Sequence, residues 1–293
     1  MTTEVKKQSS STLARDWQQF PWWLVAIIGF LTVMGYLLFA PAPADPQTGE
    51  PGDNEYNAAY EYIIGGLGNF QDLSEASLSD IIGSGISVTI YTTLVGFFIA
   101  MVFGLLAGLG RISKNVFIRN IATAYVEFIR GVPTLVLIFT VAFVIVPELS
   151  KYMGVENSVA PNTRAIVALS VIYGAFLAEV FRAGIESISR GQMEAARSLG
   201  MNYGQSMRYI ILPQAIRNIS PALGNDFIAM LKDSSLVSVL AVRDLTQQAR
   251  LYAGSSFRFR ETYLVLTFLY LTMTLTLSLL LRWYEQRIRA DER

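Results

Sequence analysis

The chain of 293 residues contains no cysteine and no histidine. Disulfides, cysteine nucleophiles and histidine general bases are therefore excluded, together with Cys or His metal ligands. No glycine-rich loop followed by Lys-Ser or Lys-Thr occurs, so we expect no nucleotide site in this chain. The 23 basic residues balance the 23 acidic ones, and this balance gives no indication of a nucleic-acid partner. We expect no catalytic residue, no metal site and no cofactor held by the chain itself.

Apolar residues are abundant instead, at 52% of the chain, and the mean hydropathy is positive. Several apolar runs approach the ~20 residues that a helix needs to cross ~30 Å of hydrocarbon. The sequence therefore predicts an all-α integral membrane protein with about six transmembrane helices. The expected spans are residues 22–40, 81–110, 121–146, 165–181, 219–242 and 263–281.

The distribution of charge predicts which side of the membrane each segment occupies. Residues 41–80 carry eight acidic residues and no Lys or Arg, whereas residues 182–217 carry five Arg and two Glu. Because basic loops stay in the cytoplasm, we expect 41–80 outside, 182–217 inside and both termini cytoplasmic. The loop 243–260 carries four Arg against this rule, and only its flanking spans place it outside.

The first eighty residues read as an addition to the main membrane domain. The run 22–40 is longer than the ~7–15 apolar residues of a signal peptide, so a retained anchor is favoured. A cleaved signal peptide is the alternative, because Ala42-Pro-Ala44 loosely imitates a cleavage site. The expected division is a cytoplasmic tail 1–21, an extra anchor 22–40, an acidic external linker 41–80, a transmembrane domain 81–285 and a cytoplasmic tail 286–293.

A polar stretch, residues 189–213, lies between two apolar runs and predicts two short helices. Gly200 stands where a left-handed C-cap is needed, and Pro213 is expected to end the second helix. Two capping-box pairs are expected, Ser189 with Gln192 and Asn202 with Gln205. From the residues alone, this loop either docks into another protein or lies as an amphipathic helix on the membrane surface.

The stretch resembles a known family. Glu194-Ala195-Ala196, then Gly200, then Ile210-x-Leu212-Pro213 is similar to the EAA-x3-G-x9-I-x-L-P loop of ABC-importer permeases. The flanking segments 127–134 and 231–238 resemble the polar-amino-acid branch of that family. The resemblance covers about residues 80–285.

This resemblance implies that residues 189–213 form a coupling helix, which enters a groove of an ATPase subunit. It also implies several partners: an ATPase dimer that binds ATP, a second permease copy or a sister permease, and an extracytoplasmic solute-binding protein. The implied cargo is a polar or charged amino acid, and the implied location is the bacterial inner membrane.

Two charged residues, Lys232 and Asp233, are expected near the middle of the fifth span. Charges at that depth usually face a bundle interior or a water-filled path. Adjacent residues on a helix point about 100° apart, so Asn225 shares a face with Lys232, and Asp226 shares one with Asp233. These four residues are candidates to line a translocation path or to lock two halves together, and structural contacts between spans are the alternative.

Glu127 and Arg130 lie three residues apart and thus on one helical face. They are further candidates for the path, although a structural clamp near its inner end is favoured over a contact with substrate.

A stand-alone secondary transporter or channel that uses Lys232 and Asp233 is the main alternative function. It predicts internal repeats among the spans, and no convincing repeat is found. It also leaves residues 189–213 unexplained. A membrane-embedded enzyme is disfavoured because His and Cys are missing.

Overall fold

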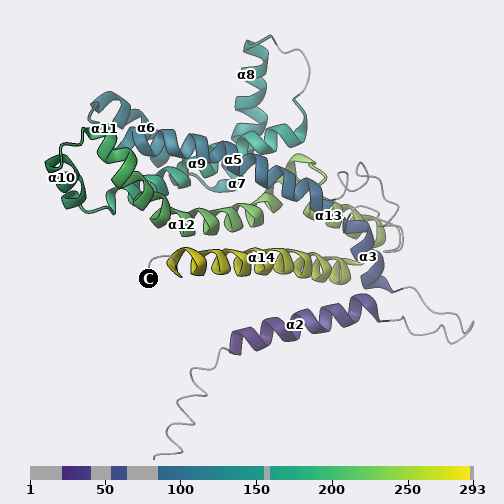
Figure 1. Ribbon diagram of the computed structural model, residues 1–293. Helices are drawn as coiled ribbons and strands as arrows, with labels where there is room; N and C mark the ends of the chain where they lie inside the picture. Colours follow the sequence, from purple (N-terminus) through teal and green to yellow (C-terminus); the bar gives the residue numbers. More distant parts are fainter. Residues whose placement is uncertain (1–21, 41–53, 65–84, 155–158, 291–293) are drawn as a thin grey trace, which may run out of the picture. The chain divides into compact units, whose positions relative to one another are not determined.

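The computed structural model describes residues 22–40, 54–64, 85–154 and 159–290. Every regular element in these ranges is a helix (Figure 1), so the expected all-α class is confirmed. The chain divides into two units, residues 1–58 and 59–293. The cytoplasmic tail 1–21 and most of the acidic linker lie outside the described residues.

The first unit contains helix α2 (Trp22–Phe39) and the start of helix α3 (Glu55–Ile64). Asn54 joins the two helix ends. Its amide NH2 donates to the carbonyls of Leu37 and Ala40, each at 2.9 Å, and its Oδ1 accepts two backbone N–H groups of α3 at 3.1 Å. The Asn54 side chain therefore forms hydrogen bonds with the free carbonyl groups at the end of α2 and with the free N–H groups at the start of α3.

The second unit holds the other helices. They are α5 (Gly85–Arg111), α6 (Val116–Gly131), α7 (Thr134–Phe139), the π-helical η2 (Thr140–Ile145), α8 (Val146–Tyr152), α9 (Pro161–Glu186), α10 (Arg190–Ser198), α11 (Tyr203–Ser206), the π-helical η3 (Met207–Ile211), α12 (Leu212–Asp233), the 3-10 helix η4 (Ser234–Leu240), α13 (Leu245–Ser256) and α14 (Phe259–Ala290).

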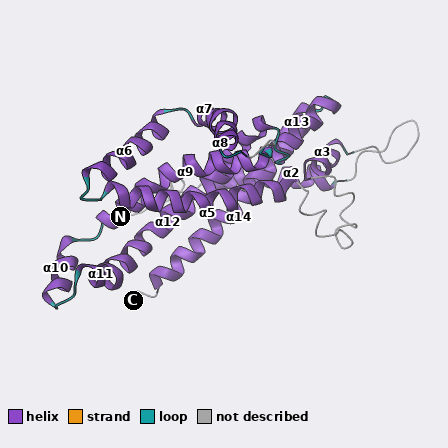
Figure 2. Cartoon of the chain, turned by 90° about the horizontal axis from the view of Figure 1, so that it is seen from above, coloured by secondary structure: helices purple, strands orange, loops and turns teal. Residues whose placement is uncertain are grey.

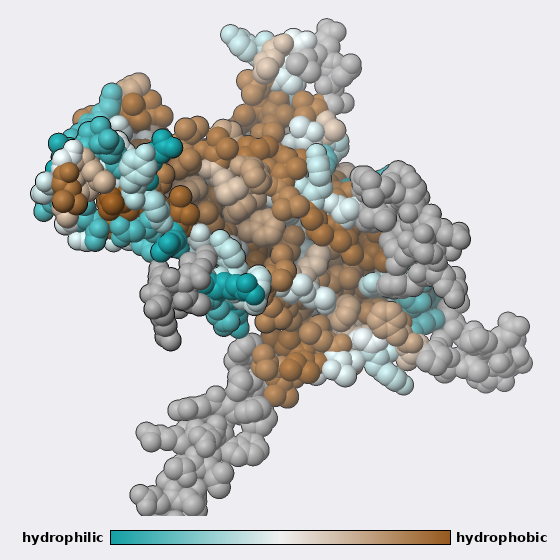
Figure 3. All heavy atoms as spheres, viewed as in Figure 1, coloured by the Kyte–Doolittle hydropathy of each residue, from teal (hydrophilic) through white to brown (hydrophobic). Residues whose placement is uncertain are grey.

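Four helices of the described part are long and apolar enough to cross a membrane: Gly85–Arg111, Thr134–Tyr152, Pro161–Glu186 and Phe259–Arg287. Leu24–Phe39 is a shorter apolar helix. Apolar side chains cover most of the visible surface of the second unit, and polar side chains gather at the end formed by α10 and α11 (Figure 3). This distribution suits a protein that contacts lipid along its length and water at its ends.

The third expected span, 121–146, has the wrong bounds, because the helix breaks between Gly131 and Pro133. α6 ends at Gly131, and Val132 has extended backbone angles (φ −113°, ψ 139°). Pro133 explains the break, because its ring disfavours helical angles in the preceding residue. The apolar span begins after this break and runs over Thr134–Tyr152.

The fifth expected span, 219–242, is also wrong as a single helix. α12 begins earlier, at Leu212, and ends at Asp233. The 3-10 helix η4 follows directly. Its C-cap residue, Ala241, has a left-handed conformation (φ 58°). The charged pair expected in mid-helix therefore lies at a helix end.

The core of the second unit is the close packing of α5 against α9, which lie side by side in Figures 1 and 2. Glycines allow this approach. A Cβ atom added at Gly104 would lie 2.6 Å from the Cβ of Leu177 and 3.1 Å from the backbone N of Ala178. Ser170 donates to the carbonyl of Gly96 at 3.0 Å across the same contact. Small residues and interhelical hydrogen bonds of this kind drive helix association in lipid.

Gly104→Ala should destabilise the protein by about 1–3 kcal/mol, because the added methyl group overpacks this contact. Gly35→Ala is the matched control, since a Cβ there meets no atom within 4 Å. Thermal unfolding of both variants in detergent measures the difference. Equal melting temperatures for the two variants would show that the α5–α9 contact tolerates a side chain at Gly104.

Candidate functional site

The loop expected from the sequence, residues 189–213, projects from one end of the second unit (Figure 1). Its first helix, α10, ends in a Schellman motif: Gly200 N–H donates to the carbonyl of Arg197 at 3.0 Å, and Met201 N–H donates to that of Ala196 at 3.2 Å. Gly200 has a φ of +83°. The predicted left-handed glycine turn is confirmed.

The second capping box is confirmed and the first is wrong. Asn202 and Gln205 each accept a backbone N–H of the other at 2.9 Å. Ser189 instead accepts the backbone N–H of Gly191 at 3.3 Å, so it caps α10 without a reciprocal bond.

Pro213 does not end the second helix, contrary to expectation. The chain runs from α11 through the π turn η3 into α12. Proline lacks an N–H group, and its ring crowds the carbonyl of the residue four positions earlier, here Tyr209. The wider π turn, Met207–Ile211, contains Tyr209 and ends two residues before Pro213, which suits this requirement. Residues 203–233 therefore form one continuous helix, which we call the helical rod.

The exposed surface of the loop combines polar and apolar side chains. Glu194 and Ala195 face solvent, whereas Ala196 is 4% exposed and packs inside the chain. Leu199 is 83% exposed and Tyr203 is 59% exposed. Both lie close to Gly200 in a polar loop, and neither is among the site residues expected from the sequence. A surface of this composition suits the docking of another protein.

The other motif residues lie where the loop joins the rod. Ile210 is partly buried, and Leu212 and Pro213 are exposed. The loop is also fastened at its base, because Asn218 in α12 donates to the hydroxyl of Ser187 after α9 at 2.9 Å. The base of the loop is thus linked to both α9 and α12.

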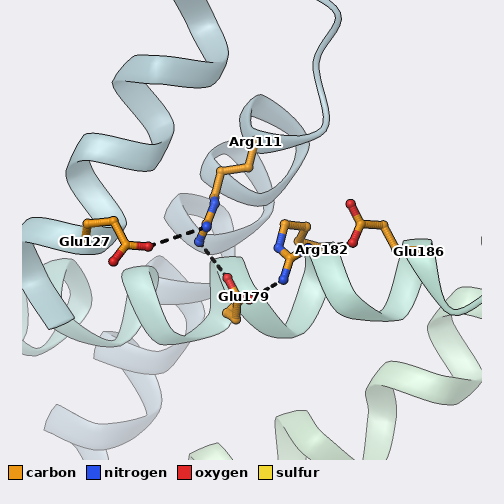
Figure 4. A network of polar contacts seen from close by, with 5 residues as sticks. All are labelled: Arg111, Glu127, Glu179, Arg182 and Glu186. Carbon is orange, nitrogen blue, oxygen red and sulfur yellow. Dashed lines mark hydrogen bonds and ion pairs between the residues drawn. The ribbon is translucent and has the colours of Figure 1, made fainter.

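A network of ion pairs joins α5, α6 and α9 (Figure 4). Arg111 donates to Glu179 at 2.6 Å and lies 3.6 Å from Glu127. Glu179 also accepts from Arg182, which donates to Glu186 at 2.5 Å. The network connects the ends of three helices near the loop.

Glu127 and Arg130, which were expected on one helical face, form no ion pair with each other. Glu127 turns toward Arg111 on a neighbouring helix, because that guanidinium lies between two carboxylates. Arg130 is exposed and forms no ion pair within the described ranges.

The four candidates on α12 separate into two faces, as their spacing predicts. Asn225 and Lys232 are exposed, whereas Asp226 and Asp233 are partly buried. Tyr173 on α9 donates its hydroxyl to Asp233 at 2.9 Å. The aspartates therefore face the helix packing, and the asparagine and lysine face outward.

Asp244 is a buried acid that is not among the site residues expected from the sequence. It is 1% exposed and caps α13 by accepting the backbone N–H of Gln247 at 3.0 Å. Burial raises the pKa of Asp244 to about 6, although backbone hydrogen bonds oppose this rise. The next polar side chain, Thr246, is hydrogen-bonded to Tyr270 of α14 at 3.0 Å.

Comparison with known proteins identifies the family. Residues 100–290 match the family described as binding-protein-dependent transport system inner membrane component. The chain belongs to this family. It is therefore a permease subunit of an ABC transporter in the inner membrane, and the prediction that it is not itself an enzyme is confirmed.

Several relatives of the permease carry descriptive names. It is 37% identical over 202 residues to the probable amino-acid permease protein YxeN of Bacillus subtilis, covering 68% of this chain and 87% of the relative. It is 33% identical over 205 residues to the glutamine transport system permease protein GlnP of Escherichia coli, covering 70% and 91%.

Solved structures share the fold of the permease. A chain of an amino acid ABC transporter crystallised with histidines is 38% identical, with a TM-score of 0.63, covering 75% of this chain and 99% of that one. A chain of the inward-facing MetNI methionine ABC transporter is 25% identical, with a TM-score of 0.56, covering 71% and 95%. Membership of this family implies ATPase and substrate-binding-protein partners for the permease.

Asp244→Asn should stabilise the permease at pH 7.5 by up to about 3 kcal/mol, because it removes a buried charge and keeps the cap. The pKa of Asp244 is higher in the folded protein than in the unfolded protein, so this carboxyl group stabilises the fold most at low pH. That contribution is lost as the pH rises through about 6.

The test measures the melting temperatures of the parent permease and of Asp244→Asn at pH 5 and pH 7.5. The difference between the two melting temperatures should be larger at pH 7.5. Asp244→Ala is the control for the cap, and it should lie about 1 kcal/mol below the asparagine variant at either pH. A difference in melting temperature that does not change with pH would contradict the raised pKa of Asp244.

Proposed function

We propose that this permease forms the translocation path for amino acids in an ATP-driven importer, with residues 189–213 docked on the ATPase. The observation that carries the proposal is the loop itself: a left-handed glycine turn presents exposed Glu194, Ala195 and Leu199 at the tip of a rod that continues into α12. A motion imposed on the tip reaches the residues of α12 that are candidates for the path. The names of the relatives support amino acids as cargo.

The assembly that we infer contains a pair of permeases, either two copies or a copy and a sister chain. ATP is bound by a partner ATPase dimer, and an external solute-binding protein delivers a polar or charged amino acid. A pair is supported by the limited burial of α14, of which only 11% of the apolar span is buried within its own chain.

The orientation and domain boundaries are part of the same proposal. Both termini are cytoplasmic, residues 22–40 are an added anchor, residues 41–80 are an external linker and residues 81–285 form the permease domain. The inner ion-pair network and Arg130 surround the cytoplasmic end of the path, and the α12 residues line or support it.

Gly200→Val and Glu194→Lys should leave the permease inserted in the membrane but weaken its retention of the ATPase and stop uptake. A side chain at a left-handed position costs about 1–2 kcal/mol, which distorts the tip. Pull-down of the ATPase and amino-acid uptake by vesicles measure the two effects.

Gly154→Val is the matched control for the glycine variant, because Gly154 is also left-handed (φ +68°) with open space around it but follows α8, away from the loop. If Gly200→Val retained the ATPase fully and supported full uptake, the loop would be only a helix at the membrane surface. The importer proposal would then lose its main support.

The topology can be tested with single cysteines, because the chain has none of its own. Arg190→Cys should react with a membrane-impermeant reagent only from the cytoplasmic side. Tyr152→Cys and Asp53→Cys should react only from the outside. Labelling of Arg190→Cys and Tyr152→Cys from the same side would refute the proposed orientation.

A further inference from the structure

An apolar groove of about 480 Å³ lies on the described part of the second unit, where α6 packs on α5 and α9. Its volume falls within the ~300–1,000 Å³ that is typical of ligand-sized pockets. Helix α5 contributes Leu106 and Gly110 to the walls, and α6 contributes Phe117, Ile118 and Ile121. Leu106 and Phe117 are exposed, so the groove opens on the surface of the chain.

The lining of this groove offers no free polar group to a ligand. Tyr125 is the only polar side chain among the residues that line it, and its hydroxyl donates to the carbonyl of Val171 at 2.6 Å. A polar ligand would leave its own donors and acceptors without partners in such a groove, which is costly. Apolar cavities also do not hold ordered water. The groove therefore suits a hydrocarbon chain.

Two cations lie beside one end of the groove. The end near Gly110 and Phe117 is next to the turn that joins α5 to α6. Lys114 lies in this turn, and Arg119 is the fourth residue of α6. Both side chains are exposed, and neither forms an ion pair within the described residues. Arg111, by contrast, already contacts two carboxylates.

The start of α6 places these two cations at neighbouring positions. Asn115 is the N-cap and accepts the backbone N–H of Phe117 at 2.9 Å. Lys114 and Arg119 therefore occupy the N′ and N4 positions, whose side chains commonly pack together at a helix start. Helical side chains tilt toward the N-terminus, so Arg119 extends back toward the turn. Two like charges at these positions repel each other, and an anionic group between them replaces that repulsion by attraction.

Helix α6 suits the surface of a membrane. It is not among the helices of the described part that are long and apolar enough to cross, yet Phe117, Ile121 and Phe128 are exposed apolar side chains. Helices that combine an apolar face with basic residues lie in the membrane–water interface. In that position the groove faces the acyl chains, and Lys114 and Arg119 face the headgroups. Basic pockets at this depth bind anionic headgroups.

We propose that an anionic phospholipid binds here, with one acyl chain in the groove and its phosphate group between Lys114 and Arg119. The apolar lining selects a lipid over a soluble phosphate, and the two cations select an anionic headgroup over one without net charge. The site goes beyond the proposed transport function. It depends on that proposal only for the leaflet, which the proposed orientation makes the cytoplasmic one.

The test uses the full-length permease in detergent, with the subunits that co-purify with it, and native mass spectrometry with added dioleoylphosphatidylglycerol. The double variant Lys114→Gln, Arg119→Gln should weaken the binding of the most tightly held phosphatidylglycerol by about tenfold or more, because it removes both charges that attract the headgroup. Dioleoylphosphatidylcholine should bind the parent protein about tenfold less tightly than phosphatidylglycerol does.

The matched control is the double variant Arg282→Gln, Arg287→Gln. It removes two exposed positive charges from α14, away from the groove, and should bind phosphatidylglycerol as the parent protein does. An equal loss of binding in this control and in Lys114→Gln, Arg119→Gln would mean that net charge alone attracts the lipid, and would overturn the proposal.

Two further measurements identify what occupies the groove. Inorganic phosphate at millimolar concentration should not displace phosphatidylglycerol, because it has no acyl chain. Ile121→Cys is a unique cysteine, since the chain has none of its own, and it can carry a benzophenone label into the groove. Irradiation of the labelled permease in membranes should give adducts with phospholipid.

The remaining outcomes each decide the proposal. Equal binding of phosphatidylglycerol by the parent and by Lys114→Gln, Arg119→Gln would overturn it, as would equal binding of the two lipids by the parent or displacement by phosphate. An adduct of the Ile121→Cys label with another protein subunit would make the groove an interface between subunits. These measurements do not depend on transport. A parent permease that binds phosphatidylglycerol but takes up no amino acid would refute the proposed function alone.

Discussion

Hydrogen bonding of the backbone inside lipid is the constraint on which this structure depends. No water is present in the hydrocarbon core to satisfy an interrupted helix, so each interruption requires a local substitute. Within the expected fifth span, a 3-10 helix follows Asp233 and keeps the backbone hydrogen-bonded. On either side of that span, a π turn precedes Pro213 and Asp244 caps α13.

The close packing of α5 on α9 supplies the rigid part against which the other helices can move. α9 is fastened to this core by glycine contacts and to the loop base by the bond between Asn218 and Ser187. Arg111 and Glu179 add an ionic link between the same two helices at 2.6 Å. By contrast, little of α14 is buried in its own chain. The chain therefore combines one tightly packed pair of helices with a helix that its own chain holds only weakly.

The sequence predicted those features that depend on nearest neighbours along the chain. Gly200 and the Asn202–Gln205 box were correct because local backbone chemistry determines them, and the two faces of α12 followed from helical geometry alone. Pro213 was misjudged because a π turn lets a helix continue through proline. The Glu127 ion pair could not be predicted, because its partner, Arg111, comes from another helix. The hydrogen bond between Thr246 and Tyr270 could not be predicted either, since the two residues come from different helices.

The π turn before Pro213 also determines how the loop tip is rotated about the helix axis relative to α12. An ordinary α-helix advances about 100° per residue, and a π turn contains one residue more than an α turn within its hydrogen-bonded ring. The tip of the loop is therefore rotated by about that angle, relative to the polar faces of α12, from where an uninterrupted α-helix would hold it. The number of residues within Met207–Ile211 therefore determines which side of the loop tip is aligned with the polar residues of α12. In this stretch the number of residues is under stricter geometric control than their identity.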